Sequence, residues 1–219
     1  MRTFMISDFG AVSDGVTVNT VAIQKALDAC HESGGGQVVV ADGDYVTGTL
    51  KMHSNIDFHL VANATLMASE NGEDYPDFDC EGWNKKDAPR ETSRCLIYLG
   101  YCENVSISGP GKIDCRGSSF CDRIKEENGT ERFVRNTSLL PARMIFVMSC
   151  ENVRLEDFTM AEMAGGWGCW INNSQYVSAE NVKMVCNPEY PNADGIHINC
   201  SSDVTVSNCV IHSGDDSII

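Results

Sequence analysis

Short apolar segments recur along the chain at a nearly fixed spacing. Four of them align on a shared valine: Val105, Val153, Val177 and Val204. The last two steps measure about 24 and about 27 residues, and the first is about twice as long, so the chain repeats in units of about 24 residues with an insertion in the first interval. A repeat of this length is typical of a solenoid, in which each unit stacks on the previous one.

The residues around the valines alternate between apolar and outward-facing positions, which is the pattern of a strand with one buried face. The equivalent upstream pairs are Ile97/Leu99, Ile145/Val147, Cys169/Ile171 and Ile196/Ile198. Downstream come Ile107, Leu155, Ala179 and Val206, then Phe158, Val182 and Cys209, and then Met160, Met184 and Ile211. Each repeat therefore predicts three short strands separated by turns. Asn181 and Asn208 also coincide, which predicts a ladder of amides along one turn.

The fixed period excludes a β-sandwich, whose strands reverse direction, and the Leu and Asn consensus of a leucine-rich repeat is missing from the sequence. The pattern favours an all-β fold, a right-handed parallel β-helix in which each coil hydrogen-bonds to the next at about 4.8 Å. We predict a single domain over residues 1–219. In this interpretation residues from 1 to about 60 form the N-terminal cap and first coils, and residues 61–219 form further coils with inserted loops.

The N-terminal third differs from the repeats. Residues 17–33 carry apolar positions at helical spacing, Asn19 is a candidate N-cap, and the glycines from Gly34 end the run. This predicts one amphipathic helix that covers the open end of the solenoid core. Three strand-like segments follow, at residues 37–40, 45–50 and 56–60. Two polar, Gly- and Pro-containing stretches, residues 70–94 and 116–136, are interpreted as loops inserted between coils.

The chain is strongly acidic, with 16 Lys plus Arg against 31 Asp plus Glu and a formal net charge of −15. This balance argues against nucleic acid or an anionic membrane as a partner, and it would also repel a polyanionic substrate. A uronic-acid polymer would therefore need a local basic cluster. The first residues contain no apolar signal-peptide core, and no apolar run of about 18 residues occurs, so the sequence predicts a cytoplasmic chain, or a secreted one if a signal was removed.

Eleven cysteines are present, an odd number without metal-ligand spacing to histidine. Buried, reduced packing thiols are therefore expected, with no metal site and no cofactor.

The acidic residues gather at one place in the repeat. Asp194 directly precedes the strand that begins at Gly195, and Asp216 directly precedes Ser217-Ile-Ile, about one coil later. With Asp215 beside Asp216, three carboxylates are expected on one strand edge. Neighbouring carboxyls do not ionise independently, and such a group can supply the acid and the base of glycosidic bond cleavage. The alternative interpretation is an acidic turn that binds its own backbone or a calcium ion.

Polar and aromatic residues continue this surface. Trp167 and Arg143 occupy the equivalent strand-edge positions in the preceding coils. Four residues are expected to point outward from the same sheet as a sugar-binding surface: Trp170, Asn172, His197 and Asn199. His197 is interpreted either as a substrate contact or as a surface imidazole, and Trp170 either as a sugar platform or as groove wall.

Several ordered motifs carry a family resemblance. They are Pro191-Asn-Ala-Asp-Gly-Ile-His-Ile, Ser202-Asp-Val-Thr-Val-Ser-Asn-Cys-Val-Ile, Gly214-Asp-Asp-Ser-Ile, Asp8-Phe-Gly-Ala with Asp14-Gly, Gly34-Gly-Gly-Gln-Val-Val-Val and Gly109-Pro-Gly-Lys-Ile-Asp114. Together they resemble glycoside hydrolase family 28, the polygalacturonases and their relatives, over nearly the whole chain. The resemblance implies hydrolysis of pectic polysaccharide or oligosaccharide with inversion. It assigns Asp215 as the acid and Asp194 and Asp216 as the residues that hold the attacking water.

The residues expected to contact substrate are His197, Asn192, Trp170 and Asn199. Ala193 departs from the family pattern, which has Thr or Ser there. The family's Gly-His-Gly and Arg-x-Lys motifs do not occur before Ile219, so the chain is expected to be the N-terminal part of a longer protein. The alternative is that it is an inactive truncated fragment.

Two other functions stay open at this stage. One is a non-catalytic β-helix that binds sugars or mediates adhesion. The other is a polysaccharide lyase, which would need a calcium site and a Lys or Arg base, and no basic residue is expected near the acidic cluster. Galacturonan and rhamnogalacturonan, endo and exo action, and the oligomeric state are likewise left open.

Overall fold

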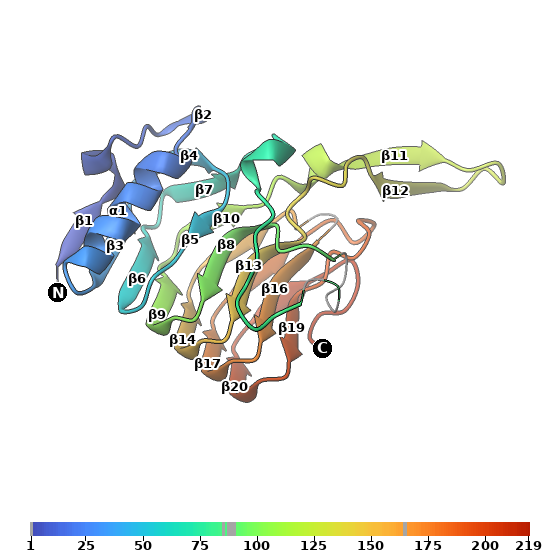
Figure 1. Cartoon of the computed structure of the whole chain (residues 1–219). Coiled ribbons are helices and arrows are strands. Elements are labelled where there is room, and N and C mark those ends of the chain that lie inside the picture. Colours follow the sequence, from blue (N-terminus) through green and yellow to red (C-terminus); the bar gives the residue numbers. More distant parts are fainter. Residues whose placement is uncertain (1, 85, 87–90, 164–165) are drawn as a thin grey trace.

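The computed structural model describes residues 2–84, 86, 91–163 and 166–219. Its strands stack into three parallel sheets that wind around one core (Figure 1). One sheet has the order β1 (Thr3–Met5), β3 (Gly36–Val40), β6 (Ile56–Leu60), β9 (Glu103–Ser108), β14 (Glu151–Glu156), β17 (Gln175–Glu180) and β20 (Ser202–Ser207). The second has the order β2 (Asp14–Val18), β4 (Gly43–Thr47), β7 (Ala64–Ala68), β10 (Lys112–Asp114), β15 (Thr159–Ala161), β18 (Lys183–Val185) and β21 (Val210–His212).

The third sheet carries the acidic residues and is called the site sheet. Its order is β5 (Leu50–Lys51), β8 (Cys95–Gly100), β13 (Arg143–Met148), β16 (Trp167–Asn172) and β19 (Ile196–Asn199). Consecutive coils contribute consecutive strands to each sheet, so the fold is the right-handed parallel β-helix that the repeat predicts.

The sequence repeat corresponds to the strand register. Val153 pairs with Val105 on one side and with Val177 on the other, and Val177 pairs with Val204. The apolar columns of the other two sheets are also in register, as the pairs Ile145 with Cys169 and Met160 with Met184 show. Apolar side chains of one column stack inside the coil and are removed from water, which is the main source of stability in such a fold.

The predicted amide ladder takes a slightly different form. Asn181 and Asn208 both adopt the left-handed conformation, with φ of 53° and 55°, at equivalent turns. The Nδ2 of Asn181 donates to Oδ1 of Asp157, one coil earlier, at 2.9 Å. A second ladder joins Asn152 Nδ2 to Asn104 Oδ1 at 2.7 Å. Short polar side chains tolerate this backbone conformation and bond to one another, so the turns of successive coils align.

The predicted helix is α1 (Thr20–Glu32), which covers the first coils together with the short 3-10 helix η1 (Ile6–Phe9) (Figure 1). Its apolar face is fully buried through Ile23, Ala26, Leu27 and Cys30. The prediction for Asn19 is half right. It stands at the N-cap position, but its side chain makes no cap bond there, because Oδ1 accepts from the Val12 amide at 2.7 Å and Nδ2 donates to the Val12 carbonyl at 3.0 Å.

The chain leaves the helix through a turn that requires glycine. Gly35 has φ of 105°, and a Cβ there would lie 2.4 Å from the Asn55 carbonyl oxygen. The strand β3 can therefore start close to the next coil.

The two stretches interpreted as loops differ from each other. In the first insert, residues 70–94, the described residues include the 3-10 helix η2 (Gly72–Asp74). They also include Trp83, which packs edge-on against Phe146 and Trp170 on the outer face of the site sheet. The second insert, residues 116–136, contains η5 (Gly117–Phe120) and a projecting antiparallel hairpin of β11 (Cys121–Lys125) and β12 (Glu131–Arg135) (Figure 1). The second insert therefore lies between coils as predicted, but it contains two strands that the interpretation as a loop did not predict.

Nine of the eleven cysteines are buried, Cys200 is exposed and Cys209 is partly exposed. No helix among the described residues is long and apolar enough to cross a membrane.

Candidate active site

The strand register brings two of the predicted carboxylates to neighbouring coils. Ile196 of β19 forms a parallel bridge with Ile218, and the Gly195 amide donates to the Asp216 carbonyl at 2.9 Å. Asp194 and Asp216 therefore occupy equivalent positions one strand apart, at a spacing of about 4.8 Å between backbones. The sequence prediction of this adjacency is confirmed by the hydrogen bonds.

Gly195 allows the two coils to approach this closely. A Cβ at that position would lie 2.2 Å from the Ser217 carbonyl oxygen and 2.8 Å from Ile211 Cγ2. Contacts below 3 Å to backbone are not tolerated, so a side chain here would push the Asp216 segment away from β19. The glycine after Asp194 thus sets the separation of the carboxylates.

Asp194 is almost completely buried, with 3% of its surface exposed. Its Oδ2 accepts a hydrogen bond from Nε2 of His197 at 2.6 Å. Its Oδ1 is also buried and accepts no hydrogen bond from any residue that the structure describes. A buried carboxylate oxygen without a donor is costly, and a hydroxyl or water that enters the site would supply one.

His197 lies where the alternation predicts, beside Asp194 and next to the strand-edge column. Its ring stacks on Trp167, with centroids 3.8 Å apart and planes at 11°. Trp167 in turn packs on the Arg143 guanidinium, whose Cζ lies 5.3 Å from the ring centroid. Arg143 is 1% exposed and donates from Nη1 to the Thr92 carbonyl at 2.5 Å. Burial lowers the pKa of this guanidinium to about 10.

These contacts form a continuous stack from the buried cation to Asp194. The imidazole plane is restrained from two directions, because one ring face stacks on Trp167 and Nε2 bonds to Asp194.

Asp215 and Asp216 are exposed, unlike Asp194. Oδ2 of Asp215 lies 3.5 Å from Nδ2 of Asn192. The turn that carries both acids is held by its backbone, since Ser213 Oγ donates to the Asp215 carbonyl at 2.8 Å and the Gly214 amide donates to the Ala193 carbonyl at 2.8 Å. One carboxylate is therefore enclosed by protein and two face solvent, which gives the three acids different surroundings.

Asn192 connects this turn to the hairpin. It adopts a left-handed conformation with φ of 51°, and its Oδ1 accepts a hydrogen bond from Nη2 of Arg135 at 2.5 Å. Burial lowers the pKa of Arg135, and the nearby Asp194 carboxylate opposes that effect. The expectation that no basic residue lies near the acids is wrong, because the hairpin, which is distant in sequence, places a guanidinium there.

Trp170 does not form part of an accessible surface. Its ring is 4% exposed, stacks on Phe146 with centroids 4.8 Å apart, and is covered by Trp83 of the first insert, 5.8 Å away. The expected sugar platform or groove wall is therefore wrong for this residue. The alternation correctly predicts that Trp170 points out of the coil, but the insert then buries it in a second apolar cluster.

Asn199 is exposed at the far end of β19. It lies five residues after Asp194 along an extended strand, so the two backbones are roughly 16 Å apart. Its neighbour in the preceding strand, Asn172, is buried and donates from Nδ2 to Met148 Sδ at 3.3 Å. The structure therefore does not bring Asn199 to the carboxylates.

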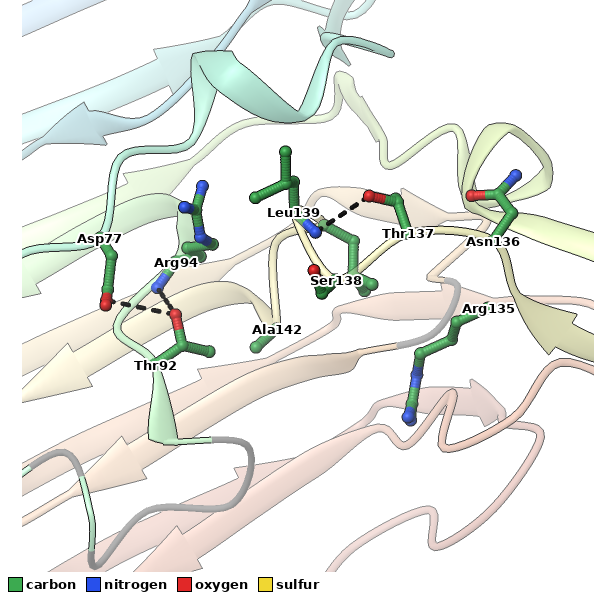
Figure 2. Close-up of a pocket in the computed structure, with 10 residues that line it drawn as sticks. Asp77, Thr92, Arg94, Arg135, Asn136, Thr137, Ser138, Leu139 and Ala142 are labelled. Atoms are coloured by element: carbon green, nitrogen blue, oxygen red, sulfur yellow. Dashed lines mark hydrogen bonds between the residues drawn. The ribbon is translucent and has the colours of Figure 1, made fainter.

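A cavity of about 680 Å³ lies between the two inserts, beside the start of β13 (Figure 2). Seven of the described residues that line it are polar: Asp77, Thr92, Arg94, Arg135, Asn136, Thr137 and Ser138. Figure 2 shows Arg135 extending from the base of the hairpin along one side of the cavity, with Thr92 and Arg94 on the other. The repeat does not predict this cavity, since its walls come from non-repeating segments.

Among the described residues no three His, Cys, Asp or Glu side chains converge to hold a metal ion. The site is thus a cluster of aspartates at one strand edge of a parallel β-helix, with a histidine and an arginine beside it.

Comparison with known proteins identifies the family. A model of the glycosyl hydrolases family 28 matches residues 30–219, and the chain belongs to that family. It is 26% identical over 253 residues to an exo-poly-α-D-galacturonosidase of Dickeya chrysanthemi, an alignment that covers 99% of this chain and 41% of that protein.

Solved structures agree with this assignment. A family 28 exopolygalacturonase of Yersinia enterocolitica superposes with a TM-score of 0.77 at 26% identity, over 99% of this chain and 44% of that one. PfbA, a surface adhesin of Streptococcus pneumoniae, gives a TM-score of 0.66 at 22% identity over 95% of this chain and 48% of that one, which shows a shared fold alone. The chain spans less than half the length of these proteins.

Proposed function

We propose that the protein containing this chain hydrolyses α-glycosidic bonds in pectic galacturonan or its oligosaccharides. The observation that carries the proposal is the register of β19 with the segment at Ile218, which sets Asp194 and Asp216 on adjacent strands with Asp215 beside them. Membership of family 28 supports the same activity.

The different surroundings of the acids support a division of roles. Asp215 is exposed on its turn and is the candidate general acid that protonates the leaving oxygen. Asp194 and Asp216 are the candidates that hold the attacking water between neighbouring strands. His197 occupies one oxygen of Asp194, and the second oxygen is the available acceptor for a proton of that water.

Inversion at the anomeric carbon follows if the water attacks opposite the leaving group. The bond between the anomeric carbon and the leaving oxygen breaks, a bond to the water oxygen forms, Asp215 gives up a proton, and the Asp194 and Asp216 pair accepts one. The enzyme returns to its starting state by proton exchange with solvent.

The test compares the full-length wild-type protein with Asp215→Asn on oligogalacturonides and on rhamnogalacturonan. Release of new reducing ends from oligogalacturonides should fall by at least ~10²-fold in the variant, because general acid catalysis contributes that much. The anomer that forms first, followed by NMR, should be inverted. A wild-type protein that binds but releases no reducing ends would support a binding module, and an unsaturated product would indicate a lyase. Either result overturns the proposal.

A further inference from the structure

The cavity between the inserts has a positive character that contrasts with the chain as a whole. Among the lining residues that the structure describes, two are arginines, Arg94 and Arg135, and one is a carboxylate, Asp77. That carboxylate accepts hydrogen bonds from the Ser93 amide at 2.8 Å and the Ser93 hydroxyl at 2.7 Å. In a chain with a formal charge of −15, this is the kind of local basic cluster that a polyanionic substrate would need.

The two arginines are held differently. Nη1 of Arg94 donates to the carbonyl oxygens of Gly72 and Tyr75, so this guanidinium is committed to the backbone of the first insert. Nη2 of Arg135 bonds to a side-chain amide oxygen, that of Asn192. A guanidinium presents its donors in a planar fork whose geometry matches a carboxylate. Arg135 is the better candidate for direct ligand contact, because Asn192 joins it to Asp215.

Arg135 also links the cavity to the acids. From Arg135 the contacts run to Asn192 and from Asn192 to Asp215. Along the coil axis, the cavity adjoins Ala142 at the entry to β13, while Asp194 precedes β19, two strands further on. Two strand spacings amount to roughly 10 Å, so a sugar chain that lies along the axis with its scissile bond at the acids would extend into the cavity.

We propose that this cavity binds a carboxylate-bearing sugar unit, a uronic acid, and that Arg135 is the specificity-determining residue that receives its carboxylate. The proposal rests on the proposed function, because it places this unit on the same oligosaccharide whose bond the aspartates cleave. In this proposal the hairpin places the Arg135 guanidinium, which the repeat does not supply, beside the aspartates.

The experiment measures binding separately from hydrolysis. The full-length protein with Asp215→Asn is titrated calorimetrically with trigalacturonate and with its methyl ester, whose carboxylates are masked. In this background Arg135→Gln should weaken binding of trigalacturonate by about 10- to 100-fold, the effect of losing a charged hydrogen bond, and should leave binding of the ester unchanged. Arg132→Gln is the matched control, since Arg132 lies on the same hairpin and pairs with Glu126 at 2.6 Å; it should bind as the parent does.

Two results would overturn the proposal: unchanged binding of trigalacturonate, or an equal loss for the acid and the ester, which would mean that Arg135 only positions Asn192. If Arg135→Gln does not fold, the parent protein decides the matter. Added salt should then weaken binding of trigalacturonate but not of the ester, and equal salt dependence would overturn the proposal.

The same assays separate this inference from the proposed function. If the wild-type protein hydrolyses oligogalacturonides and Arg135→Gln does not change KM, only the assignment of Arg135 is contradicted. If binding depends on Arg135 but the wild-type protein cleaves no substrate, only the proposal of a hydrolase is contradicted.

Discussion

The coils and the inserts contribute to the site in opposite ways. In the coils, each strand hydrogen-bonds to the next, and apolar columns such as that of Val153 and Val177 continue through the core. In the inserts no period exists, and the chain is held by particular contacts such as Trp83 on Trp170 or Phe133 on Tyr190. The coils fix where the aspartates stand, whereas the inserts decide which parts of the site sheet remain accessible and which charge lies beside the acids.

The aspartates of the site are therefore positioned by the coils, whereas the residues that would select a substrate are positioned by the inserts. Asp194 and Asp216 are placed by backbone hydrogen bonds that repeat along the solenoid. Arg135 is placed by a hairpin that the repeat does not require. Changes in an insert can therefore alter recognition while the carboxylates keep their positions.

The largest expected difference concerns stability, tested by the same substitution in each region. Phe158 is fully buried in the coil core, and Phe158→Ala should lower the free energy of unfolding by about 3–5 kcal/mol. Phe133 in the hairpin is only partly buried, with its ring edge-on to Tyr190, and Phe133→Ala should cost about 1 kcal/mol. Urea unfolding monitored by circular dichroism measures both. Equal losses would mean that the hairpin is as integral to the fold as the coils.

A smaller effect is expected where the first insert covers the site sheet. Trp83→Ala removes edge-on ring contacts with Phe146 and Trp170, and it should cost about 1–3 kcal/mol. It should also expose Trp170, so acrylamide should quench the remaining tryptophan fluorescence more strongly than in the parent. If quenching is unchanged, the insert does not shield that ring from solvent. The inserts would then not decide which parts of the site sheet are accessible.

The strands of the coils can be predicted from the sequence, whereas the packing of the inserts cannot, and the reason is physical. A strand register follows from periodic burial, so the valine columns and the adjacency of Asp194 and Asp216 could be predicted without family information. The alternation also placed Trp170 on the outer face, but it contains no information about what covers that face. Trp170 was therefore expected to meet sugar and is instead buried under Trp83.

The hairpin had a local signal that the compositional interpretation passed over. Asn128-Gly129 is a strong hairpin turn pair, and it lies between Ile124 and Phe133 in segments with alternating polar residues. Such a signal predicts the hairpin itself, but not that Arg135 reaches Asn192, because that contact depends on how the whole insert packs on the coils.

The smallest effect tests the interior of the coils by pH. Burial raises the pKa of the Cys169 thiol to about 12 from its ordinary value of 9.0. Between these values the folded thiol stays protonated while the unfolded one loses its proton, so stability is full below pH 9.0 and falls as the pH rises toward 12.

Cys169→Ala should therefore lose about 1 kcal/mol less stability than the parent between about pH 8 and about pH 10. Cys200, which is exposed, is the matched position, and Cys200→Ala should leave the pH dependence as it is. Urea midpoints at the two pH values give the comparison, and identical pH dependence in all three proteins would show that the coil interior does not hold this thiol in its protonated form.

The central claim is that the coil register assembles a catalytic carboxylate pair, and the turnover number of Asp194→Asn tests it most directly. The control is Asp203→Asn, which changes an exposed aspartate of β20, in another sheet. With oligogalacturonide as substrate, we predict that Asp194→Asn folds like the parent but loses at least ~10²-fold in kcat. Asp203→Asn should keep the parental kcat. A folded Asp194→Asn protein with parental kcat would contradict the central claim.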